Sequence, residues 1–240
     1  MGETSMIDEL NKIHAQVVIS PKNAPPEVKK RFWKLVGQIK RTSNPDQKVV
    51  NKASEIRDLL YAQRLGKTIP LKLVLPIWFV IGTTFFFEYF RNAGQEDWGG
   101  LTDWPCVLTI LGVIAFFYPF GRLIAGKLTG IKFDGLSRDI YFLPTLKINY
   151  PSYLKTSPPK RQWMFFIAGI WTVITAVIVG IVGYLRAEDI TGFAIATIVA
   201  ILELVALTGI LGKWGGEMGH FLRERRIVRD WKATLKSLNN

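Results

Sequence analysis

Four long apolar stretches alternate with polar segments after residue 68. They cover residues 69–90, 104–126, 163–185 and 190–211, and the third holds no charged residue over its 23 positions. An α-helix of that length, at about 1.5 Å per residue, matches the bilayer's hydrocarbon core of about 30 Å. The pattern predicts an all-α, polytopic membrane protein with about four transmembrane helices, in a domain over 69–212 that carries a polar loop at 127–161.

The first 68 residues follow a different pattern, in which apolar side chains recur every three or four positions. Three amphipathic helices are expected, the second starting behind Pro25-Pro26 and the third behind Asn44-Pro45. Such helices form a small bundle or rest on a membrane surface, and a dedicated module for docking a partner is the alternative. Their apolar stripes are Met6, Ile7, Leu10, Ile13 and Val17, then Val28, Phe32, Leu35, Val36 and Ile39, then Val49, Val50, Ala53, Ile56 and Leu60.

Lysine and arginine are distributed unequally around the predicted spans. The chain has 31 of them and a formal net charge of +12, and 27 lie in residues 1–68, 127–161 and 213–240. The two connections on the opposite side, 91–103 and 186–189, carry one each beside five acidic residues. Because basic segments favour the cytoplasmic side, we expect a multi-pass protein of the cytoplasmic (inner) membrane with both termini in the cytoplasm.

The C-terminal segment 213–240 combines basic and apolar positions along one predicted helix. A basic amphipathic helix close behind a span normally lies at the lipid surface, where anionic headgroups attract it. No aromatic-basic nucleic-acid-binding module accompanies it, so the expected partner is the bilayer with its anionic headgroups and not nucleic acid. The residues assigned to the lipid surface are Arg223, Arg225, Arg226, Arg229 and Trp231.

Small residues recur every four positions on the last two apolar stretches, which only four residues separate. Such a short connection makes the two spans an antiparallel hairpin. Small residues at this spacing let two helix backbones approach closely in lipid, so packing is the expected role. The positions are Thr172, Ala176 and Gly180 on the third stretch, and Gly192, Ala196 and Ala200 on the fourth.

Residues that ligate metals are scarce. The chain has one cysteine and two histidines, His14 and His220. His220 ends the stretch 216–220, Gly-Glu-Met-Gly-His, which is similar to a zinc-protease HExxH helix whose first histidine is replaced by glycine. One imidazole and one carboxylate do not make the three-ligand site of a catalytic zinc. We therefore expect neither a metal nor a cofactor.

The region from the second to the third apolar stretch carries a pattern of its own. A stretch of small and basic residues ends in Gly-Ile, a loop and a proline-rich basic segment follow, and an Ala-Gly pair lies within the third stretch. In order and spacing, residues 104–185 resemble the site-2-type intramembrane zinc metalloprotease family. The segments that carry the resemblance are Tyr118-Pro119-Phe120-Gly121-Arg122, 125–132, 142–144, 157–161 and 165–169.

This resemblance implies a family member that has lost its catalytic groups. Tyr118 and Arg122 stand where the family has two zinc-binding histidines, and Pro119 stands where it has the glutamate base. Without imidazoles no zinc is held, and without the carboxylate no water is deprotonated to attack a peptide bond. The family's later Asn-Pro and Asp-Gly element, which supplies a third ligand, has no counterpart after the third stretch.

Glu203 lies near the middle of the fourth predicted span, where a carboxylate is costly without a partner. The long side chain of Arg122, near the inner end of the second span, can reach toward it. We expect Arg122 and Glu203 to form an intramembrane ion pair. A protonated Glu203 in a packed interface and an ion or proton pathway are the alternatives.

Together these patterns favour a non-catalytic membrane protein. It would act as a binding, scaffold or accessory subunit of a larger membrane complex, with other membrane proteins as partners. Two alternatives remain from other classes. One is a membrane-embedded metalloprotease with a rearranged site around Glu217 and His220, and the other is a small transporter that uses Glu203.

Overall fold

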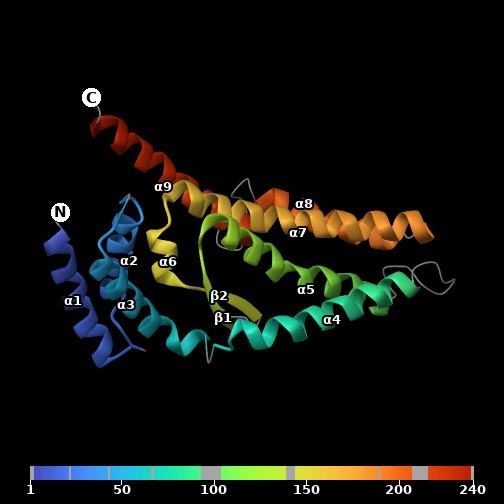
Figure 1. The fold of residues 1–240 in the computed structure, drawn as a ribbon, viewed down its shortest axis with the longest axis horizontal. Helices are drawn as coiled ribbons and strands as arrows, with labels where there is room; N and C mark the ends of the chain where they lie inside the picture. Colours follow the sequence, from blue (N-terminus) through green and yellow to red (C-terminus); the bar gives the residue numbers. More distant parts are fainter. Residues whose placement is uncertain are drawn as a thin grey trace. The chain divides into compact units, whose positions relative to one another are not determined.

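The structure is a computed structural model, and it is mostly helical (Figure 1). It describes residues 3–21, 23–42, 44–65, 68–92, 104–138, 144–188, 190–206 and 216–238. The helices are α1 (Glu3–Ile19), α2 (Pro26–Ile39), α3 (Gln47–Leu65), α4 (Leu71–Asn92), α5 (Trp104–Thr129), α6 (Tyr150–Lys155), α7 (Pro158–Ala187), α8 (Ile190–Ala206) and α9 (Gly216–Leu238). Two strands, β1 (Phe133–Arg138) and β2 (Pro144–Ile148), lie between α5 and α6.

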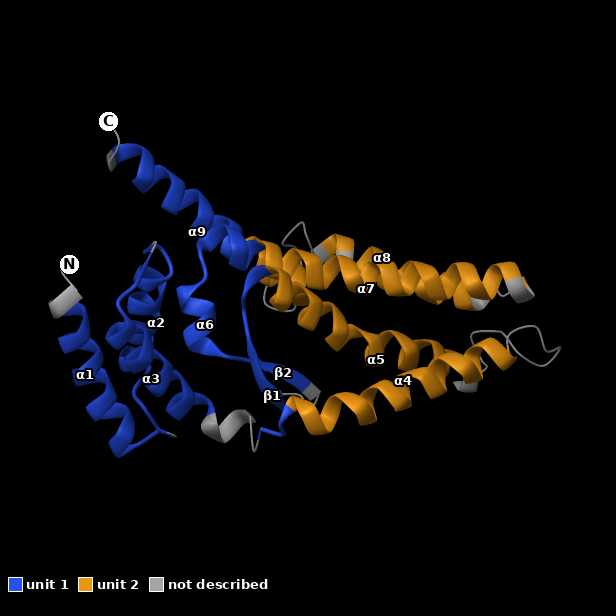
Figure 2. Cartoon of the chain, viewed as in Figure 1, with its two compact units in different colours: residues 1–70, 129–162, 223–240 blue, residues 71–128, 163–222 orange. Residues whose placement is uncertain are grey.

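The chain divides into two compact units, coloured separately in Figure 2. Unit 1 contains residues 1–70, 129–162 and 223–240, and unit 2 contains residues 71–128 and 163–222. The N-terminal region, the polar loop and most of the C-terminal segment, which the sequence pattern separates, therefore fold together in unit 1.

The three helices expected in the N-terminal region are present as α1, α2 and α3. Helix α1 packs against both α2 and α3, and the predicted stripes meet in the interior of unit 1. The apolar face of these helices is therefore covered by protein, and the region is a small bundle instead of a set of helices lying on a membrane. The buried stripe residues are Leu10, Ile13, Val17, Val28, Phe32, Leu35, Val36, Ile39, Val49, Val50, Ala53 and Ile56.

A small antiparallel sheet adds a β-element to unit 1. Strands β1 and β2 pair antiparallel with Leu136 opposite Leu146, and the register shifts between Phe133 and Gly135. Ile69 extends the ladder, because its N–H and carbonyl each bond Leu136, at 2.8 and 2.9 Å. Gly135 makes this approach possible, since a Cβ there would lie 2.3 Å from the Ile69 carbonyl oxygen.

Unit 2 holds most of the long apolar helices of the chain. Among the described residues, α4, α5 and α7 are long and apolar enough to do so, which supports a membrane protein. Helix α8 has 17 residues, about 25 Å of helix, and the predicted fourth span continues into 207–211, outside the described residues. The fourth crossing therefore stays a prediction.

All four of these helices contribute to one apolar core in unit 2. Tyr89 of α4 is fully buried there, and its hydroxyl donates to the Val179 carbonyl of α7 at 3.4 Å. The other buried members are Ile110, Val113 and Ile114 of α5, Ala176 of α7, and Ile195 and Ala196 of α8.

Helices α7 and α8 approach most closely where small residues were expected to pack. A Cβ placed on Gly180 would lie 2.9 Å from the Cβ of Ala196. Thr172, Ala176 and Ala200 are also buried. Between the helices, Glu188 takes a left-handed conformation with φ 51°, and its N–H donates to the Tyr184 carbonyl at 2.8 Å. The short connection predicted from the sequence is therefore a tight helix-ending turn.

Candidate functional site

The predicted degenerate motif lies on α5, where Tyr118 and Arg122 are one helical turn apart and share a face. Both side chains reach the same carboxylate, that of Glu217 at the start of α9. The Tyr118 hydroxyl donates to Glu217 Oε1, and Arg122 donates through Nε at 2.5 Å and pairs through Nη2. Glu217 is 1% exposed, so this is a buried ion pair within unit 2.

Close packing holds the two helices of this cluster in place. Met218, next to Glu217, is fully buried, and a Cβ on Gly169 of α7 would lie 2.7 Å from its methyl group. On α5, Gly121 leaves room for the Trp171 ring, since a Cβ there would lie 2.5 Å from it. The Trp171 indole N–H donates to the Phe117 carbonyl at 3.0 Å.

A second tryptophan binds the same part of α5. The Trp78 indole of α4 donates to the Phe116 carbonyl at 2.7 Å, one residue before the carbonyl that Trp171 uses. Pro119 lies in the interior of α5 and has no N–H to give to the helix, so the helix ladder is interrupted in this turn. In an apolar unit, indole donors need acceptors, and this turn of α5 supplies two of them.

The chemistry of the cluster is that of charge neutralisation. Glu217 Oε1 accepts the Tyr118 and Arg122 donors, while Oε2 is buried and bonds no group among the described residues. A guanidinium bound directly to a carboxylate opposes a divalent cation at the same place. His220, the other residue of the alternative metal site, stacks its ring on Phe165 at a centroid separation of 4.9 Å.

The predicted partner of Arg122 was Glu203. The structure brings Arg122 to Glu217, and the Glu203 side chain lies outside the described residues. The pairing of Arg122 with Glu203 therefore stays a prediction. The pairing of Arg122 with Glu217 was not predicted, because in the sequence Glu217 is recognisable only as part of an incomplete zinc motif.

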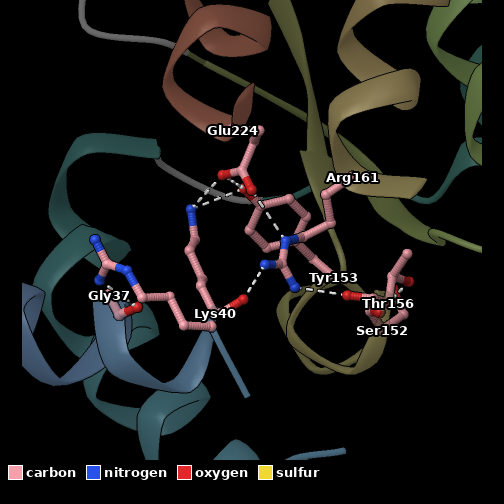
Figure 3. A network of polar contacts seen from close by, with 8 residues as sticks. Gly37, Lys40, Ser152, Tyr153, Thr156, Arg161 and Glu224 are labelled. Carbon is pink, nitrogen blue, oxygen red and sulfur yellow. Dashed lines mark hydrogen bonds and ion pairs between the residues drawn. The ribbon is translucent and has the colours of Figure 1, made fainter. Parts of the chain in front are cut away.

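A second buried polar cluster lies in unit 1 and was not predicted (Figure 3). At its centre is Glu224 of α9, which is 2% exposed. Lys40 Nζ donates to Glu224 Oε1 at 2.7 Å, the Tyr153 hydroxyl donates to the same oxygen at 2.6 Å, and Arg161 Nε donates to Oε2 at 3.0 Å. We call these four residues the Glu224 cluster.

Arg161 is the most deeply buried charge of this cluster, with no exposed surface. Beyond Glu224, it donates to the Thr156 carbonyl at 2.6 Å and to the Lys40 carbonyl. The cluster therefore joins the end of α2, the helix α6, the start of α7 and the middle of α9. Segments more than 180 residues apart in the chain meet at one carboxylate.

Burial and the nearest charges shift the pKa in opposite directions for Lys40 and Glu224, and in the same direction for Tyr153. Burial lowers the pKa of Lys40, and the neighbouring Glu224 charge offsets only part of that effect. Burial also raises the pKa of Tyr153, and the Glu224 charge raises it further. For Glu224 itself burial works toward a higher pKa, but Lys40 and Arg161 hold the pKa below its usual value. The Glu224 carboxylate is therefore ionised and the Tyr153 phenol neutral at neutral pH, with Arg161 and Lys40 bonded to the carboxylate.

The basic residues assigned to the lipid surface lie around this buried acid on α9. Arg223, Arg225, Arg226 and Arg229 are exposed, and Trp231 is half-buried. Val228, an apolar residue of the same helix, is buried in unit 1. Asp230 accepts from Arg41 Nη2 at 3.0 Å, in a pair with both side chains over 40% exposed. One face of the helix thus packs on protein, while the arginines remain accessible.

The remaining comparisons add no candidate chemistry. Within the described part of the chain, no three His, Cys, Asp or Glu side chains are grouped as a metal site requires. No model of a protein family, no curated protein and no solved structure matches the chain.

Proposed function

We propose that this chain is a non-catalytic membrane protein that serves as a binding, scaffold or accessory subunit of a larger membrane complex. The observation that carries the proposal is the bond of Arg122 and Tyr118 to Glu217. The two positions at which the resembled protease family has zinc-binding histidines hold a phenol and a guanidinium here. The guanidinium neutralises a buried carboxylate, and the phenol donates a hydrogen bond to it. Removing the Arg122 charge would leave the Glu217 carboxylate buried without this cation, so the cluster has a structural role.

The proposed topology has four spans with both termini in the cytoplasm. Helices α4, α5 and α7 supply three of them and α8 supplies the fourth. Unit 1 then lies on the cytoplasmic side, because its three segments carry most of the lysine and arginine of the chain. Anionic headgroups of that leaflet are the partner we propose for the exposed arginines of α9.

A polar groove on unit 1 gives a partner protein a place to bind. It lies between α1 and α2, has a volume of about 400 Å³ and carries charges of both signs. Arg31 and Lys34 of α2 line it together with Asp8, Glu9 and Lys12 of α1. Mixed charge at a groove rim selects partners by electrostatic complementarity. We propose that this groove receives a polar segment of a neighbouring subunit.

The experiment is purification of the full chain in a mild detergent after cross-linking in membranes, with identification of the proteins that are bound. We expect a defined set of membrane proteins at constant stoichiometry. Lys34→Glu, which reverses a charge in the groove, should lose that set. Lys48→Glu, an exposed lysine on α3 that does not line the groove, is the matched control and should keep it.

The same preparation tests the metalloprotease alternative. A chain that purifies alone with one zinc per molecule, and loses it on His220→Ala, would contradict the proposal. A partner set that is equally lost by Lys34→Glu and Lys48→Glu would contradict the role of the groove. Flux of ions into liposomes that depends on Glu203 would favour the transporter instead.

A further inference from the structure

A second groove lies within unit 2, between the transmembrane helices α4 and α5. Its volume is about 400 Å³. Six of its lining residues come from a single face of α4, and one comes from α5. They are Val80, Ile81, Thr84, Phe85, Glu88, Asn92 and Thr109.

The base of this groove is fixed by an aromatic ring. Phe85 stacks on Phe116 of α5, with ring centroids 5.3 Å apart. Gly112 lets the ring lie directly on the α5 backbone, since a Cβ there would come 2.9 Å from Phe85 Cδ1. The groove is thus held open by packed groups and has a defined floor.

Polarity changes along the groove. Val80 and Ile81 are exposed apolar residues at one end, and Glu88 and Asn92 lie at the other. Glu88 is four residues from the end of α4, about 6 Å along the helix axis. If α4 crosses the bilayer, the apolar end faces acyl chains and the polar end is at headgroup level.

Glu88 lies at the polar end of the groove, and only one oxygen of its carboxylate accepts hydrogen bonds from the described residues. Arg91 Nη2 donates to Glu88 Oε2 at 2.8 Å, and Asn92 Nδ2 donates to the same oxygen at 3.2 Å. Glu88 Oε1 accepts no hydrogen bond from the described residues. The Arg91 side chain is itself 71% exposed, so a free acceptor and an accessible cation lie side by side.

We propose that this groove binds one phospholipid whose headgroup carries a primary ammonium, as in phosphatidylethanolamine. An acyl chain lies along Val80, Ile81 and Phe85. The ammonium donates to Glu88 Oε1, and the phosphate lies against Arg91. A headgroup with both a cationic donor and an anion matches the two charges at this end of the groove, whereas a purely anionic headgroup meets the Glu88 carboxylate.

The size of the groove favours an acyl chain over a partner helix. A helix about 10 Å wide fills about 400 Å³ in each 5.4 Å turn. The groove therefore accepts no more than one turn, while helices that adhere in membranes pack along several turns. An extended hydrocarbon chain is thinner and fits lengthwise.

The test is native mass spectrometry of the full chain released from detergent with phosphatidylethanolamine, phosphatidylcholine or phosphatidylglycerol added. We expect the wild-type chain to bind ethanolamine lipid about tenfold more tightly than glycerol lipid, since one charged hydrogen bond distinguishes them. Choline lipid, which has no N–H to donate, should fall between them.

Two variants and one control locate the site. Glu88→Gln should reduce ethanolamine-lipid binding to the level of glycerol lipid, and Thr84→Trp should abolish it by filling the groove. Glu188→Gln removes an exposed glutamate that does not line the groove and should bind as the wild type does. All variants should elute as the wild type does in size-exclusion chromatography.

Three results would overturn the proposal. The first is equal binding of ethanolamine and glycerol lipid by the wild-type chain. The second is wild-type binding by Glu88→Gln or by Thr84→Trp. The third is a dimer that Thr84→Trp dissociates, which would make a second copy of the chain the occupant.

Discussion

Removal of the Glu224 carboxylate is the most informative perturbation of unit 1. In Glu224→Ala, Lys40 loses its ion pair with Glu224, and Arg161 keeps two backbone carbonyls as its acceptors among the described residues. The Arg161–Glu224 pair is deeply buried, with 0% of the Arg161 side chain and 3% of the Glu224 side chain exposed. Breaking a buried pair on one side costs about 3–5 kcal/mol, because the remaining charge is left without compensation.

Hydrogen exchange of the α2 amides in the full chain, followed by mass spectrometry in detergent at pH 7, measures this loss. A change of about 3 kcal/mol lowers protection more than a hundredfold when exchange reports the opening equilibrium. The matched control is Asp230→Ala, which breaks the exposed pair with Arg41 on the same two segments. Exposed pairs contribute about 0–1 kcal/mol, so its protection should change less than about fivefold.

The comparison can refute the reasoning in two ways. If Glu224→Ala and Asp230→Ala changed protection equally, burial would not decide the strength of these pairs. If Glu224→Ala changed protection in α4 as much as in α2, the loss would not be confined to unit 1. The double variant Arg161→Met with Glu224→Leu separates the charge from the packing, because replacing both partners by apolar groups is often close to neutral.

Three further outcomes are expected. Because folding lowers the pKa of Glu224, the ionised carboxylate contributes fully to stability above its ordinary pKa of about 4.3, and this stabilisation is lost as the pH falls through the lowered pKa. Denaturation midpoints followed by fluorescence should therefore decrease below about pH 4. The decrease should be smaller in Glu224→Gln. Gly180→Ile should destabilise the α7–α8 contact by about 1–3 kcal/mol in thermal unfolding, whereas Val177→Ile on an exposed position should not. Glu217→Ala should lower the melting temperature and Arg122→Met with Glu217→Leu should restore most of it; equal melting temperatures for the two would contradict a charge-driven effect.

Much of the helical structure could be predicted from local pattern. The stripe at positions 28, 32, 35, 36 and 39 is the buried face of α2, because a helix must turn a periodic apolar face to the interior. The apolar stretches predicted as spans coincide with α4, α5, α7 and α8 within a few residues in the described ranges. The packing of Gly180 on Ala196 also followed from local spacing and a short connection.

The polar clusters could not be predicted in the same way, because their members are distant in sequence. Lys40 and Glu224 are 184 residues apart, and no periodicity relates them. One local signal was available: Glu224 is the single acid in the run 223–226, Arg-Glu-Arg-Arg. The sequence pattern predicts a lipid-surface position for these arginines, and no role is predicted for the acid between them.

The two buried carboxylates of α9 bind the same kinds of donor but differ in how many of their oxygens accept hydrogen bonds. Glu217 and Glu224 are seven residues apart in the helix, and each accepts from one arginine and one tyrosine. Glu224 has donors on both oxygens, with Lys40 added, while Glu217 has them on Oε1 alone among the described residues. The chain has a net charge of +12, and each of these buried acids is bound by an arginine. A general base needs an oxygen that is free to take a proton from a substrate, whereas an arginine bound to the carboxylate stabilises its ionised form and weakens it as a base. The same contacts that make Glu224 a structural residue of α9 therefore argue against its acting as a general base.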